Sequence, residues 1–93
     1  MDLYIIRRRS AWADLEEVKS AGEKSTRVGE EMSGQVRWIR SYLVGESDGR
    51  IGSVCIYEGR DAESIREHGR RIGAPADELN LVEQTVVVRG DPS

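Results

Sequence analysis

The spacing of hydrophobic and polar positions divides the chain into six segments. Short apolar runs rich in β-branched and aromatic residues predict strands, whereas apolar residues that recur every three or four positions predict amphipathic helices. These criteria predict strands over 3–6, 35–44, 51–58 and 79–89, and helices over 11–32 and 62–72. A turn at 45–49 separates the two central strands, and residues 90–93 form a tail.

The resulting order, β-α-β-β-α-β, is typical of the ferredoxin-like α+β fold. In this fold two helices cover one face of a four-stranded antiparallel sheet. Helix-capping residues support the assignment, because Asp61 precedes the second helix and Gly73 follows it. Ser10 is the expected cap of the first helix. A chain of 93 residues is expected to form one domain, here spanning 1–93.

The two central strands predict a hairpin with two chemically different faces, because side chains alternate along a strand. Closing the turn at 45–49 places Trp38 near Tyr57 and Arg40 near Cys55. We expect the helices to cover an apolar face made of Ile39, Leu43, Val54 and Ile56. The face left open then contains Trp38, Arg40, Tyr42, Ile51, Ser53, Cys55 and Tyr57.

This open, aromatic face predicts an interaction surface. Hydrophobic residues make up 38% of the chain, phenylalanine is absent and 33% of residues are charged, so the core is expected to be thin. A second copy packed sheet against sheet would bury further apolar surface. We therefore expect a homodimer of the dimeric α+β-barrel type, and a ligand cavity lined by the same residues is the alternative use of this face.

Charge and cysteine content narrow the classes of partner. The chain has 14 Lys and Arg against 17 Asp and Glu, and Arg7–Arg9 is its only basic run, so no nucleic-acid partner is expected. A single cysteine cannot form an internal disulfide, which favours the cytoplasm. No apolar run approaches the roughly 18 residues of a membrane span, so no membrane association is expected.

The candidate chemistry is sparse. The chain has no zinc-type spacing of Cys and His, no phosphate-binding loop and no nucleophile elbow, so catalytic residues stay unassigned. His68 suits acid–base chemistry or simple packing, and Cys55 suits a soft ligand or an inert core position. Arg40 suits an anion or an aromatic ring. The candidate ligand-binding residues are Arg7, Trp38, Arg40, Tyr42, Cys55, Tyr57 and His68.

Four segments together carry a family resemblance over nearly the whole chain. They are MDLYII at 1–6, VRWIRSYL at 36–43, VCIYE at 54–58 and HGRRIGAPADEL at 68–79. With these segments the chain resembles the DUF4242 family of small ferredoxin-like proteins, some of them described as nickel-binding. The resemblance implies a dimeric α+β sandwich or barrel, with nickel as the possible cofactor.

The residues that would bind nickel differ in this chain. Family members described as nickel-binding have histidines in the first strand, where this chain has Arg7 and Arg8, and only His68 is retained. Arginine adds positive charge beside a cation, whereas imidazole is a natural nickel ligand. We therefore expect no native nickel site and favour an anion or a small organic molecule.

Three functions follow from these observations. The first is a small-ligand or metal-binding protein of the DUF4242 type. The second is a cofactor-free enzyme of the dimeric α+β-barrel type, with a cavity between sheet and helices and with Arg40, Tyr42, Cys55 and His68 as its candidate residues. The third is a purely structural dimerisation module.

Overall fold

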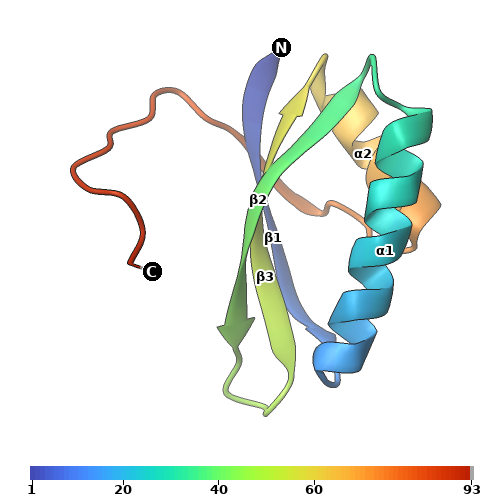
Figure 1. The fold of residues 1–93 in the computed structure, drawn as a ribbon, viewed down its shortest axis with the longest axis vertical. Coiled ribbons are helices and arrows are strands. Elements are labelled where there is room, and N and C mark those ends of the chain that lie inside the picture. The colour runs from blue at the N-terminus through green and yellow to red at the C-terminus, as the bar shows by residue number, and fades with distance from the viewer. Residues whose placement is uncertain (93) are drawn as a thin grey trace.

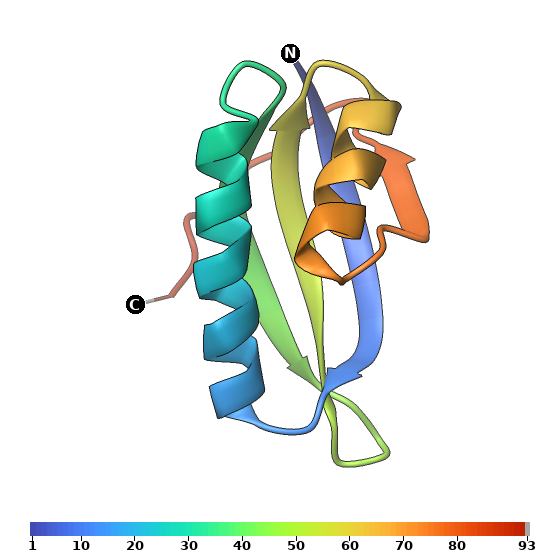
Figure 2. The same cartoon turned by 90° about the vertical axis from the view of Figure 1, so that its right-hand side faces the viewer.

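The computed structural model describes residues 1–92 and contains six elements in the predicted order. They are β1 (Asp2–Trp12), α1 (Leu15–Glu31), β2 (Val36–Gly45), β3 (Ile51–Gly59), α2 (Ala62–Ile72) and β4 (Glu78–Leu81). The strands form one sheet in the order β2-β3-β1-β4, and neighbouring strands are antiparallel. Both helices lie on the same face of the sheet (Figures 1 and 2), which confirms the ferredoxin-like α+β fold.

The first helix begins later than predicted because a different residue caps it. Asp14 accepts a hydrogen bond from the amide of Glu17 at 3.0 Å, and the Glu17 carboxylate accepts one from the amide of Ala13 at 2.9 Å. The first bond satisfies an amide that the first helical turn leaves without a partner, and the second fixes the chain just before the helix. Ser10 was expected to be the cap, but it lies inside β1 with a φ of 48°.

The first strand is correspondingly longer than the predicted segment 3–6. It continues through Arg7–Arg9 to Trp12, with an irregular register against β3 between Arg8 and Trp12. The arginines therefore lie within the sheet and not beyond its end. Since side chains alternate along a strand, Arg8 shares its face with the buried residues Tyr4 and Ile6.

The second helix matches its prediction at both ends. Asp61 accepts hydrogen bonds from the Ser64 amide and hydroxyl at 2.8 and 2.7 Å. Gly73 ends the helix in the left-handed conformation at a φ of 73°, which glycine adopts without steric cost. Within residues 1–92, neither α1 nor α2 is long and apolar enough to cross a membrane.

The faces of β3 are the reverse of the prediction. Ser53, Cys55 and Tyr57 point toward the helices and are only 1, 5 and 2% exposed. Val54 and Ile56, which were expected in the core, alternate with them and lie on the open face. Both faces of this strand carry hydrophobic side chains, so alternation alone does not decide which of them the helices cover.

A β-bulge divides β2 between the two faces. Trp38 pairs with Tyr57 as predicted, but the register shifts before Arg40, so that Arg40 pairs with Ile56 and Ser41 with Cys55. A bulge adds a residue on one strand and reverses the direction of the side chains that follow. Trp38 therefore lies under the helices, whereas Arg40 lies on the open face as predicted. Ile39 also lines the open face, so its expected core position was wrong.

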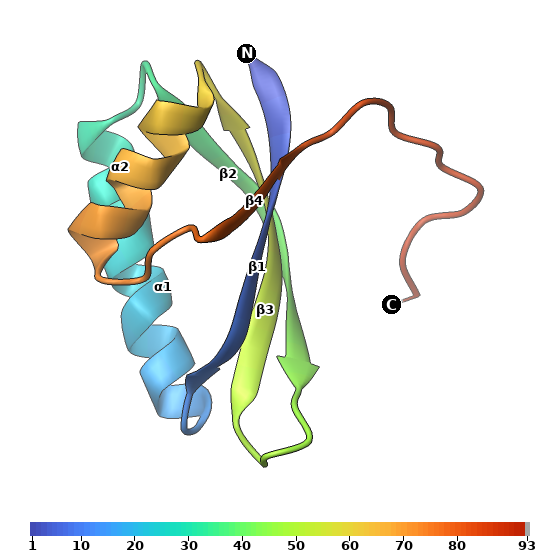
Figure 3. The ribbon, with the colours of Figure 1, turned by 180° about the vertical axis from the view of Figure 1, so that it is seen from behind.

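The last strand is much shorter than the predicted segment 79–89. Pairing with β1 ends at Leu81, and Val86, Val87 and Val88 lie outside the sheet at 78, 75 and 81% exposure. The chain beyond β4 runs along the side of the sheet opposite the helices (Figures 1 and 3). Of the predicted tail over 90–93, residue Ser93 lies outside the described residues.

Candidate functional site

A cavity of about 60 Å³ lies between the sheet and the helices. Its walls come from β1, β2 and β3 on one side and from α1 and the end of α2 on the other. Both tryptophans of the chain, Trp12 and Trp38, line it. Most of the wall is apolar, and its polar groups include Arg8, Ser41, Ser53 and Cys55.

The Cys55 thiol lies at the centre of these polar groups. It accepts a hydrogen bond from the Ser41 hydroxyl at 3.1 Å and donates one to the Ser53 hydroxyl at 3.3 Å. The Nη1 atom of Arg8 approaches the same sulfur at 3.7 Å. The bulge in β2 creates this cluster, because without it the residue opposite Cys55 would be Arg40 and not Ser41.

Arg8 differs from its two neighbours in how its charge is balanced. Arg7 forms a bidentate ion pair with Glu46, and Arg9 forms one with Glu78. Arg8 is only 7% exposed, and its Nε and Nη2 atoms donate to the Ala74 carbonyl at 3.0 and 2.8 Å. Among residues 1–92 it forms no ion pair with a carboxylate.

Tyr57 connects the cavity to both helices. Its ring stacks on Trp38 with centroids 6.0 Å apart, and its hydroxyl lies 2.7 Å from the Ser25 hydroxyl on α1. Burial raises the pKa of the Tyr57 phenol to about 12, so the hydroxyl is neutral at physiological pH. These contacts hold the aromatic wall of the cavity in one orientation.

His68 lies behind Tyr57 and does not line the cavity. The ring is 1% exposed, packs at 5.2 Å from the Tyr57 ring, and donates from Nε2 to the Ser25 carbonyl at 3.2 Å. Burial lowers the pKa of His68, the hydrogen bond to Ser25 opposes this shift, and the nearby charges of Arg8 and Arg71 add to it. The imidazole is therefore neutral and acts as a core residue that joins α2 to α1.

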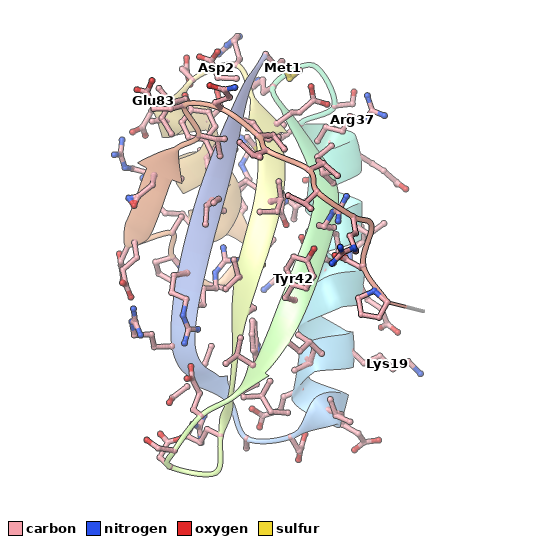
Figure 4. The ribbon with its side chains drawn as sticks, turned by 90° about the vertical axis from the view of Figure 1, so that its left-hand side faces the viewer. Met1, Asp2, Lys19, Arg37, Tyr42 and Glu83 are labelled. Carbon is pink, nitrogen blue, oxygen red and sulfur yellow. The ribbon has the colours of Figure 1, made fainter. Side chains whose placement is uncertain are left out.

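A separate group lies on the open face of the sheet. Arg40 donates to the Tyr42 hydroxyl at 3.0 Å and to the Asp91 carboxylate at 3.2 Å, and Tyr42 donates to Asp91 at 2.7 Å. Figure 4 shows Tyr42 on this face, with the C-terminal segment passing in front of the sheet. Arg40 and Tyr42 therefore do not join Trp38, Cys55 and Tyr57 in one site.

A second, wider pocket of about 430 Å³ lies outside the cavity, between the far end of β1 and the loop after α2. Arg7, the remaining predicted site residue, lies here. Arg8 and Trp12 line both spaces, so the two spaces adjoin at these residues.

Sequence reasoning missed Arg8, Ser41 and Ser53 as candidate site residues. A signal for Arg8 exists in the alternation of the first strand, because Tyr4, Ile6 and Arg8 occupy successive positions on one face. The sequence contains no such signal for Ser41, because the bulge in β2 decides which face of the sheet its side chain lies on.

The donor groups do not fit a nickel ion. Over residues 1–92 no three His, Cys, Asp or Glu side chains come close enough to hold a metal ion. The Nε2 atom of His68 is already bonded to Ser25, and Cys55 faces the positive charge of Arg8. A divalent cation would be repelled by this guanidinium and would lack the imidazole or carboxylate ligands that hold such ions.

Comparison with known proteins identifies relatives of this chain. A family model described as "Nickel responsive protein SCO4226-like" matches residues 4–82. The crystal structure of SCO4226 from Streptomyces coelicolor A3(2) has a TM-score of 0.74 and 20% identity, covering 90% of this chain and 99% of that chain. At this identity the likeness shows the fold. No curated protein matches the sequence significantly. The matched family is related to DUF4242, so the predicted resemblance is confirmed at that coarser level.

Proposed function

We propose that this chain, which belongs to the SCO4226-like nickel-responsive family, binds a small organic ligand in the cavity between its sheet and its helices. The supporting observation is the cluster of polar groups in the otherwise apolar wall of that cavity. A thiol, two hydroxyls and a guanidinium converge there within an apolar surrounding. Small-molecule sites have this composition, with an apolar lining and a few polar groups that orient the ligand.

Folding stability alone does not account for these buried polar side chains. A buried polar group contributes little net stability when paired and costs about 1–3 kcal/mol when its partner is lost. A chain of 93 residues has a thin core, and apolar side chains at these positions would strengthen it. Retaining Arg8, Ser41, Ser53 and Cys55 in the core is therefore better explained by binding than by folding.

An organic ligand is favoured over a metal ion for this chain. The family is described as nickel-responsive, but the residues of this chain are poor nickel ligands. The only histidine is enclosed in the core, and the only cysteine lies beside Arg8. This donor set favours a molecule that accepts hydrogen bonds over a cation that requires lone-pair donors.

Filling the cavity tests the proposal. Gly22 lines the cavity on α1, and a Cβ atom there would lie 3.8 Å from the Trp38 ring. We expect Gly22→Leu to occupy the cavity and to raise Tm, because leucine also replaces glycine within a helix at a gain of roughly 1 kcal/mol. Small carboxylates, amides and alcohols that change wild-type tryptophan fluorescence should no longer do so in this variant. Ser20→Leu, on the exposed side of the same helix, is the matched control.

The outcomes separate the candidate functions. Binding in Gly22→Leu that matches the wild type would show that the ligand lies elsewhere. A panel without any binder would contradict the proposal. A rise in wild-type Tm with Ni²⁺ that a chelator reverses would favour a metal site instead.

We further propose that two copies pack through their open sheet faces. Ile5, Ile39 and Tyr42 on this face are 37, 41 and 42% exposed, and the valines of 86–88 are more exposed still. Large apolar side chains that gather on one exposed face often mark an interaction site. A second copy is the favoured occupant because its own C-terminal segment offers β-prone residues that have no strand partner among residues 1–92.

A further inference from the structure

The buried charge of Arg8 lacks a counter-charge within the described chain. The side chain is 7% exposed, and residues 1–92 place no carboxylate in an ion pair with it. The charges of its neighbours on β1 are neutralised within the chain, since Arg7 and Arg9 each form an ion pair with a glutamate. A guanidinium stays charged at all physiological pH values, so its burial favours an anion from outside the chain.

The hydrogen bonds of Arg8 leave room for such an anion. A guanidinium has five N–H donors, and the bonds to the Ala74 carbonyl and the Cys55 sulfur use three of them. The remaining donors belong to a planar group whose geometry matches a carboxylate. The Ser41 and Ser53 hydroxyls lie around the same sulfur and offer further polar contacts.

We infer that the ligand is a short-chain aliphatic monocarboxylate, with its carboxylate on Arg8 and its alkyl group against the apolar wall near Trp38. This inference rests on the proposed function of the cavity and specifies the ligand class. A volume of about 60 Å³ has room for roughly four to six water-sized groups, the size of acetate to butyrate. One negative charge balances Arg8, whereas a phosphate dianion would bury an excess charge.

The outer pocket provides a route to Arg8. It shares Arg8 and Trp12 with the cavity. The other charges around it are balanced or negative, because Arg7 and Arg9 are paired with glutamates and Asp77 also lines the pocket. Within the described chain, Arg8 is therefore the charge on this route that attracts an anion.

A comparison of isosteres tests the ligand class. Propionate and its neutral amide, propionamide, have the same size and differ in charge. Titrations followed by tryptophan fluorescence report on the cavity, because both tryptophans line it. We expect wild-type protein to bind propionate at least about tenfold more tightly than propionamide, which corresponds to one charge-assisted contact. Inorganic phosphate should bind more weakly than propionate.

Substitutions of two adjacent arginines test whether the preference for propionate over propionamide depends on Arg8. Arg8→Met should abolish the preference for propionate, leaving the two isosteres within about twofold of each other, whereas Arg9→Met at an exposed position should retain it. If Arg8→Met does not fold, Arg8→Lys retains the charge with altered geometry and should lower the preference without removing it. Loss of the preference in Arg9→Met, or its persistence in Arg8→Met, overturns the inference.

The wild-type data also separate this inference from the proposed function. Equal affinity for propionate and propionamide, or tighter binding of phosphate, overturns the carboxylate assignment and leaves a ligand cavity in place. If neither isostere binds but another fragment does so in a manner blocked by Gly22→Leu, the ligand class is wrong and the proposed function stands. If no fragment binds, both fail.

Discussion

At the residue scale, the unusual feature is how many polar side chains the small core contains. Arg8, Ser25, Ser53, Ser64 and His68 are all buried. Every buried side-chain nitrogen or oxygen in the described chain has a hydrogen-bond partner. Such fully paired groups orient the elements around them, but they make the core sensitive to any change in charge.

His68 makes this sensitivity measurable. Burial keeps its folded-state pKa below the value of about 6.5 expected in the unfolded chain, so the unfolded state binds the proton more readily. The full contribution of His68 to stability is present above about pH 6.5 and is lost as pH falls through the folded-state pKa. We expect the free energy of unfolding to fall by at most about 1.4 kcal/mol per pH unit in this range. Denaturant unfolding between about pH 7.5 and 5 measures it.

His68→Gln is the control for this measurement, because glutamine can still donate to the Ser25 carbonyl but does not titrate. The carboxylates with lowered pKa, including Glu46 and Asp61, also stabilise the fold, but they lose that contribution only at pH values below about 4.5. A wild-type slope between about pH 5 and 6.5 that persists in His68→Gln would show that another group is responsible.

At the scale of the elements, the hairpin of β2 and β3 controls the site. The bulge in β2 brings Ser41 to Cys55 and directs Arg40 to the other face. Its strands also approach β1 closely near Gly52. A Cβ atom at Gly52 would lie 2.5 Å from the backbone oxygen of Arg8, whereas one at Gly45 would meet nothing within 4 Å.

These two glycines allow a matched test of the close approach. We expect Gly52→Ala to destabilise the protein by roughly 2 kcal/mol or more, because the backbone of β1 must move to make room. Gly45→Ala should change stability by no more than about 0.5 kcal/mol. Urea unfolding of both variants gives the comparison. Equal effects of the two changes would mean that β1 and β3 are not held together as closely as the structure indicates.

At the scale of the whole molecule, the sheet separates the two surfaces for which functions are proposed. The cavity lies on the helix side, and the hydrophobic surface proposed for a second copy lies on the other side. Figures 1 and 3 show the C-terminal segment on this second side, away from both helices. Ligand binding and self-association are therefore expected to respond to different substitutions.

A substitution that introduces a charge on the C-terminal segment tests the proposed dimer. We expect wild-type protein to have twice its chain mass of 10.4 kDa in light scattering. Val87→Asp should give a monomer, because an unpaired carboxylate would be buried between the two sheets. Ser20→Asp on the exposed side of α1 should remain dimeric. A monomeric wild type at about 0.1 mM, or a dimeric Val87→Asp variant, would contradict the proposed interface.

The sequence by itself determined the order of the elements and most of their ends. Periodicity and capping residues are local properties, and they located the hairpin turn and both ends of α2 correctly. The valine-rich segment at 85–88 also has a strong local preference for strand, but a strand needs a partner, and none is within reach in the described chain.

Only the tertiary structure decided which face of the hairpin the helices cover. Cys55 and Tyr57 alternate with Val54 and Ile56, and all four are suitable for burial. The choice depends on the register against β1 and on the bulge before Arg40, which are set by contacts between distant segments. For the same reason the candidate site could not be assembled from the sequence. Its central charge, Arg8, is recognised as a binding group only because the folded chain, as far as residue 92, places no carboxylate beside it.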